Sequence, residues 1–358
     1  MTTEQLEKLA LEQGNPCVSI SLNTHRTRPD NAKDAILLKN LIKEAEERLL
    51  RDFNKREVIS IIDAIKQTEE RIDVNQNLDS LHIFVSANCT YVYRSPWPTR
   101  EDSVRISDRF YLKHLIKNWN NTEDYLILLL SQSGVSLFSA INDKITDEVR
   151  NWGFPFSENP LYITNSEQAS DSKQGDKLIR EYFNRVDKAV VKAHNELGMH
   201  IVAICTPENY TMLMQVADKP SAYFGFAPIN YNDVAQHTLV KQAWSVVLDV
   251  QKNRRTQAVE EMKQAVGQGK VVTDLNEIYR AINEGRGELL IAHDGFTQAV
   301  RISDSNTLEP VNEASAPNTI DDITGELAWN VIAKKGRALF TQRDDIKSIG
   351  DIALKLRY

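Results

Sequence analysis

Apolar side chains recur along the chain at two spacings, every three to four residues in some segments and every second residue in others. The first spacing places them on one face of a helix, and the second places them on one face of a strand. In the N-terminal third these patterns predict helices over residues 3–13, 32–52 and 55–70, and strands over residues 17–22, 81–87 and 90–94. The last two strands flank Asn88, and we expect them to form a hairpin.

The pattern restarts after Asn120-Asn121, where two predicted strands, residues 125–130 and 135–140, form a second hairpin. The polar segment 170–177, which has a glycine near its middle, is predicted to be a flexible surface loop. A helix with an apolar stripe follows it, and its other face carries Arg180, Arg185, Lys188 and Lys192. On local features alone that basic face is an ordinary solvated helix surface. A strand over residues 200–206 and a helix through residues 212–216 come next.

Helix and strand alternate clearly in the last third of the chain. One helix is predicted to begin at residue 239, and three more to cover residues 256–265, 275–283 and 320–335. Strands are predicted over residues 288–292, 296–302, 337–342 and 352–358. Gly285 follows the third of these helices and is placed to end it with a positive φ. Such alternation is typical of layered α/β domains.

Length and pattern together predict three domains, because 358 residues exceed what one small core organises. We expect an α+β domain over residues 1–120, an α/β domain over residues 121–244 and a second α/β domain over residues 245–358, with the last boundary near Lys241.

The charge balance argues against general attraction to polyanions. The formal net charge is -7, and residues 121–244 contain 10 basic and 15 acidic residues. A contact with RNA would therefore use a local patch, and we expect neither DNA nor a membrane as a partner. The longest apolar run, residues 125–130, is too short to span a bilayer, and the N-terminus has no signal-peptide pattern, which predicts a cytoplasmic protein. The three cysteines lie in or beside apolar runs and are predicted to be buried thiols.

Motifs for covalent, nucleotide or metal chemistry are not evident in the sequence. The segment Gly267-Gln268-Gly269-Lys270 lacks the first glycine and the final Ser/Thr of a phosphate-binding loop. The seven histidines form no HExxH motif and no close pair with a cysteine, and no Gly-x-Ser-x-Gly elbow occurs. We therefore expect no cofactor, no metal and no locally encoded catalytic residue, although a site assembled from distant residues stays open.

The densest basic cluster outside a helix contains His25, Arg26, Arg28 and Lys33, just after a predicted strand. Such a cluster suits contacts with RNA phosphates. The alternative is a solvated loop that starts a helix.

Several segments, in order, resemble the archaeo-eukaryotic class-1 peptide-chain release factor and Pelota superfamily, in particular its bacterial branch. They are the opening Pro16-Cys17-Val18-Ser19-Ile20-Ser21-Leu22-Asn23-Thr24-His25-Arg26, the hairpin at residues 125–140, the loop and helix at residues 172–193, the segment 274–291 and the ending 349–358. The resemblance covers nearly the whole chain. It implies a ribosome-facing first domain, a middle domain with a Gly-Gly-Gln loop, and a last domain similar to ribosomal proteins that bind kinked RNA.

At the position of the family's catalytic loop this chain has Lys173-Gln174-Gly175 and no Gly-Gly-Gln. The resemblance therefore implies RNA or ribosome contacts by Lys173, Gln174, Gly175 and Lys177 without catalysis, since one glycine gives less backbone freedom than two.

We expect a protein that binds the ribosome or tRNA in hibernation, rescue or a stress response, without hydrolysing peptidyl-tRNA. The last domain is a possible site for a protein partner, as in the family. Two alternatives stay open: a hydrolase that acts through the middle domain, and a non-ribosomal adaptor. The acidic middle domain favours the adaptor, because like charge repels phosphate.

Overall fold

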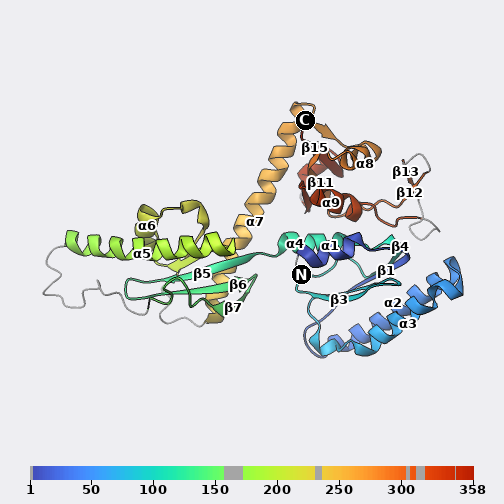
Figure 1. Ribbon diagram of the computed structural model, residues 1–358, viewed down its shortest axis with the longest axis horizontal. Helices are drawn as coiled ribbons and strands as arrows, with labels where there is room; N and C mark the ends of the chain where they lie inside the picture. Colours follow the sequence, from blue (N-terminus) through green and yellow to red (C-terminus); the bar gives the residue numbers. More distant parts are fainter. Residues whose placement is uncertain (1–2, 157–171, 230–235, 304–306, 312–318, 343) are drawn as a thin grey trace. The chain divides into compact units, whose positions relative to one another are not determined.

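The computed structural model describes residues 3–156, 172–229, 236–303, 307–311, 319–342 and 344–358. The chain forms two compact units, one combining Met1–Asn120 with Gln257–Tyr358 and the other comprising Asn121–Thr256. Helices and sheets occur in both (Figure 1), which confirms the predicted mixed α/β fold. Within the described ranges, no helix combines the length and apolar character needed to cross a bilayer.

The N-terminal part of the first unit is an antiparallel sheet with helices on both faces. Its four strands follow the order β3-β2-β1-β4. They are β1 (Gln13–Asn23), β2 (Ser80–Val85), β3 (Thr90–Ser95) and β4 (Ser103–Arg109), and the helices are α1 (Thr3–Leu11), α2 (Asn31–Asp52), α3 (Lys55–Arg71) and α4 (Lys113–Asn121). Because strand residues alternate in direction, Val18 and Ile20 pack with α2 and α3, whereas Cys17 packs with α1 and α4.

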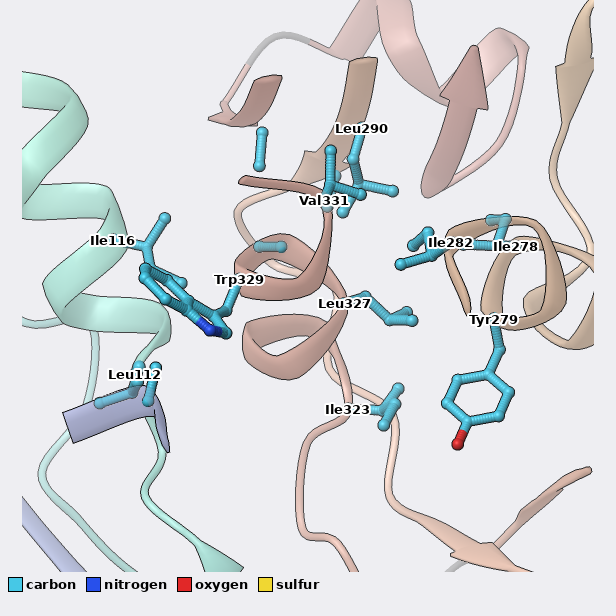
Figure 2. Close-up of a cluster of buried hydrophobic side chains, with 14 of the residues drawn as sticks. Leu112, Ile116, Ile278, Tyr279, Ile282, Leu290, Ile323, Leu327, Trp329 and Val331 are labelled. Atoms are coloured by element: carbon cyan, nitrogen blue, oxygen red, sulfur yellow. The ribbon is translucent and has the colours of Figure 1, made fainter. Parts of the chain in front are cut away.

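The C-terminal part of the first unit is a second sheet, in the order β10-β15-β11-β14, with β11 and β14 parallel. Its strands are β10 (Val271–Val272), β11 (Gly287–His293), β14 (Arg337–Thr341) and β15 (Ile352–Leu356), beside a separate ribbon of β12 (Val300–Ile302) and β13 (Leu308–Pro310). Its helices are α8 (Leu275–Asn283) and α9 (Thr324–Ala333). Leu112 and Ile116 belong to the same core as Trp329 of α9, and Figure 2 shows Ile116 beside the indole ring. The two parts thus share a hydrophobic core.

The second unit is a mixed sheet of five strands in the order β7-β6-β5-β8-β9, with β5, β8 and β9 parallel. The strands are β5 (Asp124–Leu130), β6 (Val135–Ile141), β7 (Lys144–Glu148), β8 (His200–Cys205) and β9 (Tyr223–Pro228). α5 (Ser172–Leu197) and α6 (Pro207–Val216) pack on one face (Figure 1), and the first half of α7 (Gln236–Gly267) packs on the other.

Most predicted elements are confirmed within a few residues. The pattern did not indicate α4 or the strands β4, β7, β9, β10 and β13, which are all short. The two predicted helices starting at residues 239 and 256 are one helix, α7, so the proposed boundary near Lys241 lies inside it. Residues 296–299 do not extend β12. The division into three domains stays a prediction.

The predicted loop at residues 170–177 is also wrong in part. α5 begins at Ser172, so the segment from there to Lys177 is the start of the helix, while residues 170–171 lie outside the described residues. Polar composition misled the prediction, since a helix can begin with residues that belong to no apolar stripe. All three cysteines are free thiols; Cys17 and Cys205 are buried and Cys89 is half-buried.

Candidate nucleic-acid interface

α5 presents a row of basic side chains to solvent. The exposed cations of the row are Lys177, Arg180, Arg185, Lys188 and Lys192. The opposite side of the helix is fixed by burial, because Tyr182, Phe183 and Val186 are fully enclosed against the sheet of the second unit. Since α5 cannot rotate without exposing these side chains, the row is held outward.

These five cations, which we call the α5 row, have no carboxylate partner in the described part of the chain. Glu181 is exposed among them but forms no ion pair with a described residue. At a rise of 1.5 Å per residue, the fifteen steps from Lys177 to Lys192 span about 22 Å. That length matches several phosphates of one nucleic-acid strand, which are spaced about 3.4 Å apart along the helix axis. The α5 row can therefore contact several phosphates without first breaking an ion pair to any described carboxylate.

The residues predicted to contact RNA at the former loop lie at the N-terminal end of the same helix. Lys173, Gln174 and Gly175 belong to the first turns of α5, and the side chains of the first two lie outside the described residues. Gly175 has no positive φ, and a Cβ at this position would meet no atom within 4 Å. The helical conformation therefore does not use the freedom that glycine offers. Lys177 is exposed and belongs to the α5 row.

The second predicted cluster begins where β1 ends, and its histidine is tied to α2. The backbone N–H of His25 donates to Asp34 Oδ2 at 2.8 Å, and His25 Nδ1 lies 2.8 Å from Asp34 Oδ1. The Asp34 side chain is 2% exposed, whereas that of His25 is 52% exposed. The hydrogen bond with Asp34 raises the pKa of His25. This histidine therefore serves first to fix the turn between β1 and α2.

The remaining cations of that cluster also have partners. Arg26 donates from Nε and Nη2 to the two carboxylate oxygens of Asp79 at 2.7 and 2.8 Å. Lys33 Nζ lies 3.5 Å from Asp30, with both side chains exposed. Arg28 Nη2 donates to the amide oxygen of Asn75, at 3.5 Å. The structure brings the four residues together, but nearby carboxylates offset most of their charge, so the cluster attracts phosphate less than the α5 row does.

Two further basic groups were missed by the sequence analysis. Arg254 of α7 lies over the ring of Phe224, 5.0 Å from its centroid, and pairs with Glu123 at 3.1 Å. Arg100 and Lys117 are far apart in sequence and come together only in the folded first unit. Clustering along the chain cannot reveal either group. In the described ranges, no group of three or more His, Cys, Asp or Glu side chains is arranged to hold a metal ion.

Comparison with known proteins places the α5 row in a recognised segment. Residues 124–286 match the model of bacterial archaeo-eukaryotic release factor family 3. Over this segment the chain is similar to that release-factor family. The expected resemblance is confirmed, and the whole of α5 lies inside the segment that matches the release-factor family.

Solved structures of release factors and Pelota proteins resemble the chain as well. The archaeal translation termination factor aRF1 is 14% identical, with 99% of this chain and 96% of that chain covered and a TM-score of 0.25. Dom34 of S. cerevisiae, a translation termination-like factor, is 14% identical, with 78% of this chain and 73% of that chain covered and a TM-score of 0.40. The archaeal Pelota in a model of ribosome-bound Pelota and ABCE1 is 13% identical, with coverage of 100% and 94% and a TM-score of 0.42. No curated protein matches the chain.

Proposed function

We propose that this protein is a release-factor-like factor that binds the ribosome or tRNA, in hibernation, rescue or a stress response, and does not hydrolyse peptidyl-tRNA. The observation that carries the proposal is the α5 row, five exposed cations that pair with no carboxylate among the described residues and that lie in the segment matching the release-factor family. An archaeal Pelota of the same superfamily is described as ribosome-bound, which agrees with this role.

Close to α5, the positive charge of the α5 row outweighs the net negative charge of the second unit. The net charge of a domain acts over long distances, but salt screens exposed charges beyond about 8 Å at physiological ionic strength. The electrostatic energy of a phosphate that lies against Lys188 and Lys192 therefore depends mainly on those two ammonium groups. This favours docking on RNA over the adaptor alternative.

The salt dependence of ribosome binding tests this proposal. We compare the full-length protein with Lys188→Gln/Lys192→Gln and with the control Lys43→Gln/Lys66→Gln, which removes the same charge from ion-paired positions on α2 and α3. Each lost phosphate contact should reduce the slope of log K against log salt by about 0.7–0.9, so the α5 variant should lose about 1.4–1.8 and the control almost nothing. Equal slopes for all three proteins would contradict the α5 docking surface.

The absence of hydrolysis needs its own assay. Release-factor chemistry requires a backbone amide presented closely to the tetrahedral intermediate, with a water beside it. Lys173 and Gln174 put two long side chains where the family has adjacent glycines. Ribosomes carrying labelled peptidyl-tRNA should release no more peptide with this protein than without it. Release that disappears in Gln174→Ala would instead support the hydrolase alternative.

A further inference from the structure

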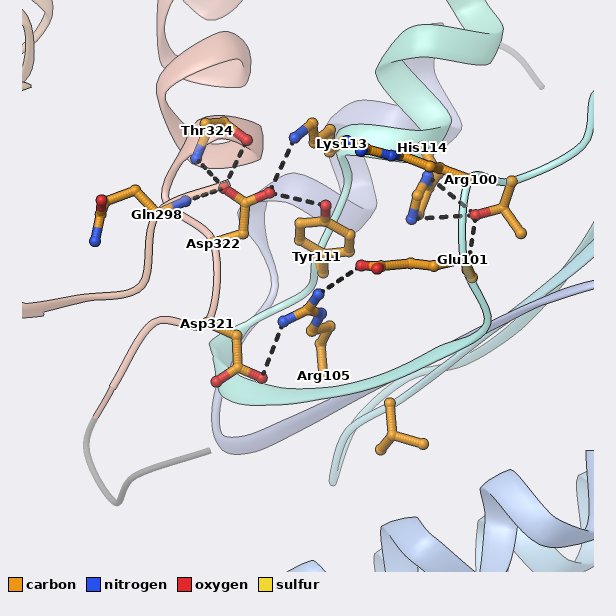
Figure 3. Close-up of polar contacts among 12 residues, drawn as sticks. Arg100, Glu101, Arg105, Tyr111, Lys113, His114, Gln298, Asp321, Asp322 and Thr324 are labelled. Carbon is orange, nitrogen blue, oxygen red and sulfur yellow. Dashed lines mark hydrogen bonds and ion pairs between the residues drawn. The ribbon is translucent and has the colours of Figure 1, made fainter. Parts of the chain in front are cut away.

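A polar cavity of about 150 Å³ lies in the first unit, beside α4. Its polar lining includes Arg100 before β4, Lys113, His114 and Lys117 of α4, and Asp294 and Thr297 after β11. One water needs about 10–15 Å³ of such space, so the cavity has room for several waters or for one tetrahedral anion. Figure 3 draws Arg100, Lys113 and His114 with their surroundings.

The two lysines of the cavity are held by fixed contacts. Lys113 Nζ lies 3.2 Å from Asp322 Oδ2 and donates to the carbonyl oxygen of Phe296 at 2.6 Å. Lys117 Nζ donates to Asp294 Oδ2 at 2.6 Å. The side chain of Lys113 is 5% exposed and that of Lys117 is 26% exposed. Both ammonium groups are therefore positioned before any ligand arrives, and Lys117 keeps part of its surface open.

Arg100 differs from the two lysines because it has no carboxylate partner in the described chain. Its Nη1 donates to the carbonyl oxygen of Asp294 at 3.3 Å, which leaves most of the five guanidinium N–H groups available. Gly295 makes room for this approach, since a Cβ there would lie 3.0 Å from Arg100 Nη1 and 3.1 Å from His293 Nδ1. The guanidinium is exposed at the mouth of the cavity.

The carboxylates around the cavity are each matched by a different cation. Asp294 pairs with Lys117, Asp322 pairs with Lys113, and Glu101 accepts from Arg105 Nη2 at 2.8 Å. Among the described residues, Arg100 is therefore the cation of the lining that pairs with no carboxylate. A site with fixed ion pairs and one uncompensated guanidinium has a net attraction for a small anion.

His114 adds a neutral hydrogen-bonding group to the wall. Burial, followed by the charges of Lys113 and Lys117, lowers its pKa to about 3, so the ring is uncharged at neutral pH. A neutral imidazole keeps one donor and one acceptor nitrogen. Thr99 Oγ1 lies 3.4 Å from both ring nitrogens. Together with the hydroxyl of Thr297, the wall supplies neutral donors as well as charge.

We propose that this cavity binds an oxoanion of the phosphate or phosphate-monoester class, with Arg100 as the principal contact and Lys117 as the second. Guanidinium groups favour such ligands, because two parallel N–H groups match two oxygens of a tetrahedral anion. The proposal is independent of ribosome docking by the α5 row, since its residues lie in the first unit and those of the row in the second.

The test uses full-length protein and two probes, inorganic phosphate and AMP, at constant ionic strength set with chloride. Binding by calorimetry should be saturable, and at ten times its Kd the ligand should raise the melting temperature of the first unit by about 3–6 °C. Saturation with phosphate assigns the site to the free anion, and stronger saturation with AMP assigns it to a monoester. The proposal would be overturned if neither probe gave a saturable response up to about 20 mM, a concentration well above the Kd of a specific site.

Two variants and one control locate the response. Arg100→Gln should weaken binding at least tenfold (about 1.4 kcal/mol), and Gly295→Ala should weaken it by displacing Arg100 without removing any charge. Arg56→Gln, which removes an exposed arginine of α3 in the same unit, should bind like the wild type. Wild-type affinity in both Arg100→Gln and Gly295→Ala would show that the anion binds elsewhere and would overturn the assignment.

Discussion

Two buried histidines of the first unit should make its stability fall steeply in mild acid. His82 is fully enclosed, with its ring nitrogens 2.9 Å from Ser21 Oγ and 2.9 Å from Ser80 Oγ. Its ring stacks on His114 with 5.8 Å between centroids. Burial is the main cause that lowers the pKa of each to about 3, from an ordinary value of 6.5. Neither ring can take up a proton without being exposed or leaving a buried charge.

The direction and the size of this change in stability follow from proton linkage. Between pH 6.5 and pH 3 the unfolded chain binds protons at these positions and the folded chain does not, so the free energy of unfolding decreases as pH falls. The contribution is fully present above pH 6.5 and is lost progressively below it. At pH 5 the loss is about 2 kcal/mol for each histidine and about 4 kcal/mol for the pair.

Urea unfolding of the full-length protein at pH 7 and at pH 5 measures this loss. In His114→Gln the pH-dependent part should shrink to about 2 kcal/mol, because only His82 still titrates. His237→Gln, which removes an exposed histidine of α7, should keep the wild-type dependence. Equal stability of the wild type at pH 7 and pH 5, or an undiminished loss in His114→Gln, would refute this account of the two rings.

Three further outcomes are expected. Lys113→Met should destabilise the first unit by about 3–5 kcal/mol, because it leaves the buried carboxylate of Asp322 without its cation. Chemical denaturation measures this, and Lys117→Met, at a more exposed position, should lower the free energy of unfolding by less. Gly285→Ala should lower the free energy of unfolding by about 1 kcal/mol or more, because φ is +77° there, whereas Gly267→Ala at the end of α7, without a positive φ, should not; equal melting temperatures would contradict the predicted strain. Arg26→Ala/Arg28→Ala should reduce the salt slope of ribosome binding by less than Lys188→Gln/Lys192→Gln, because Asp79 already binds Arg26 with two hydrogen bonds; an equal or larger reduction would place the docking surface at the N-terminal cluster.

The pattern of apolar residues was sufficient to predict a helix or strand wherever that element buries a single face. The spacing of apolar residues in α2, α3 and α8 gave their positions within two residues, since those helices pack a single stripe on a sheet. The hairpin of β5 and β6 and the positive φ of Gly285 were likewise predictable, because both depend on neighbours along the chain. The resemblance was confirmed by the family match over residues 124–286, which contain the predicted hairpin and the long helix after it, because such segments are continuous in sequence.

Only part of each candidate site could be predicted from the sequence. It showed that Arg185, Lys188 and Lys192 share a helix face, because that follows from 3.6 residues per turn. It did not show that Asp79 lies within 2.7 Å of Arg26, 53 residues away, or that the row on α5 has no such partner in the described chain. The start of α5 was misplaced because the sequence of its first turns is polar and carries no apolar signal.

The sequence by itself therefore determined most of the helices and strands, the similarity to the release-factor family and the row of basic side chains on one helix face. Only the tertiary structure decided which charges are offset and which remain available, and it alone assembled Arg100, Lys117 and Asp294 around one cavity. The physical reason is the range of the interactions. Amphipathic periodicity is set by neighbours along the chain, whereas Coulomb energies and hydrogen bonds depend on distances in space that the packing of remote segments fixes.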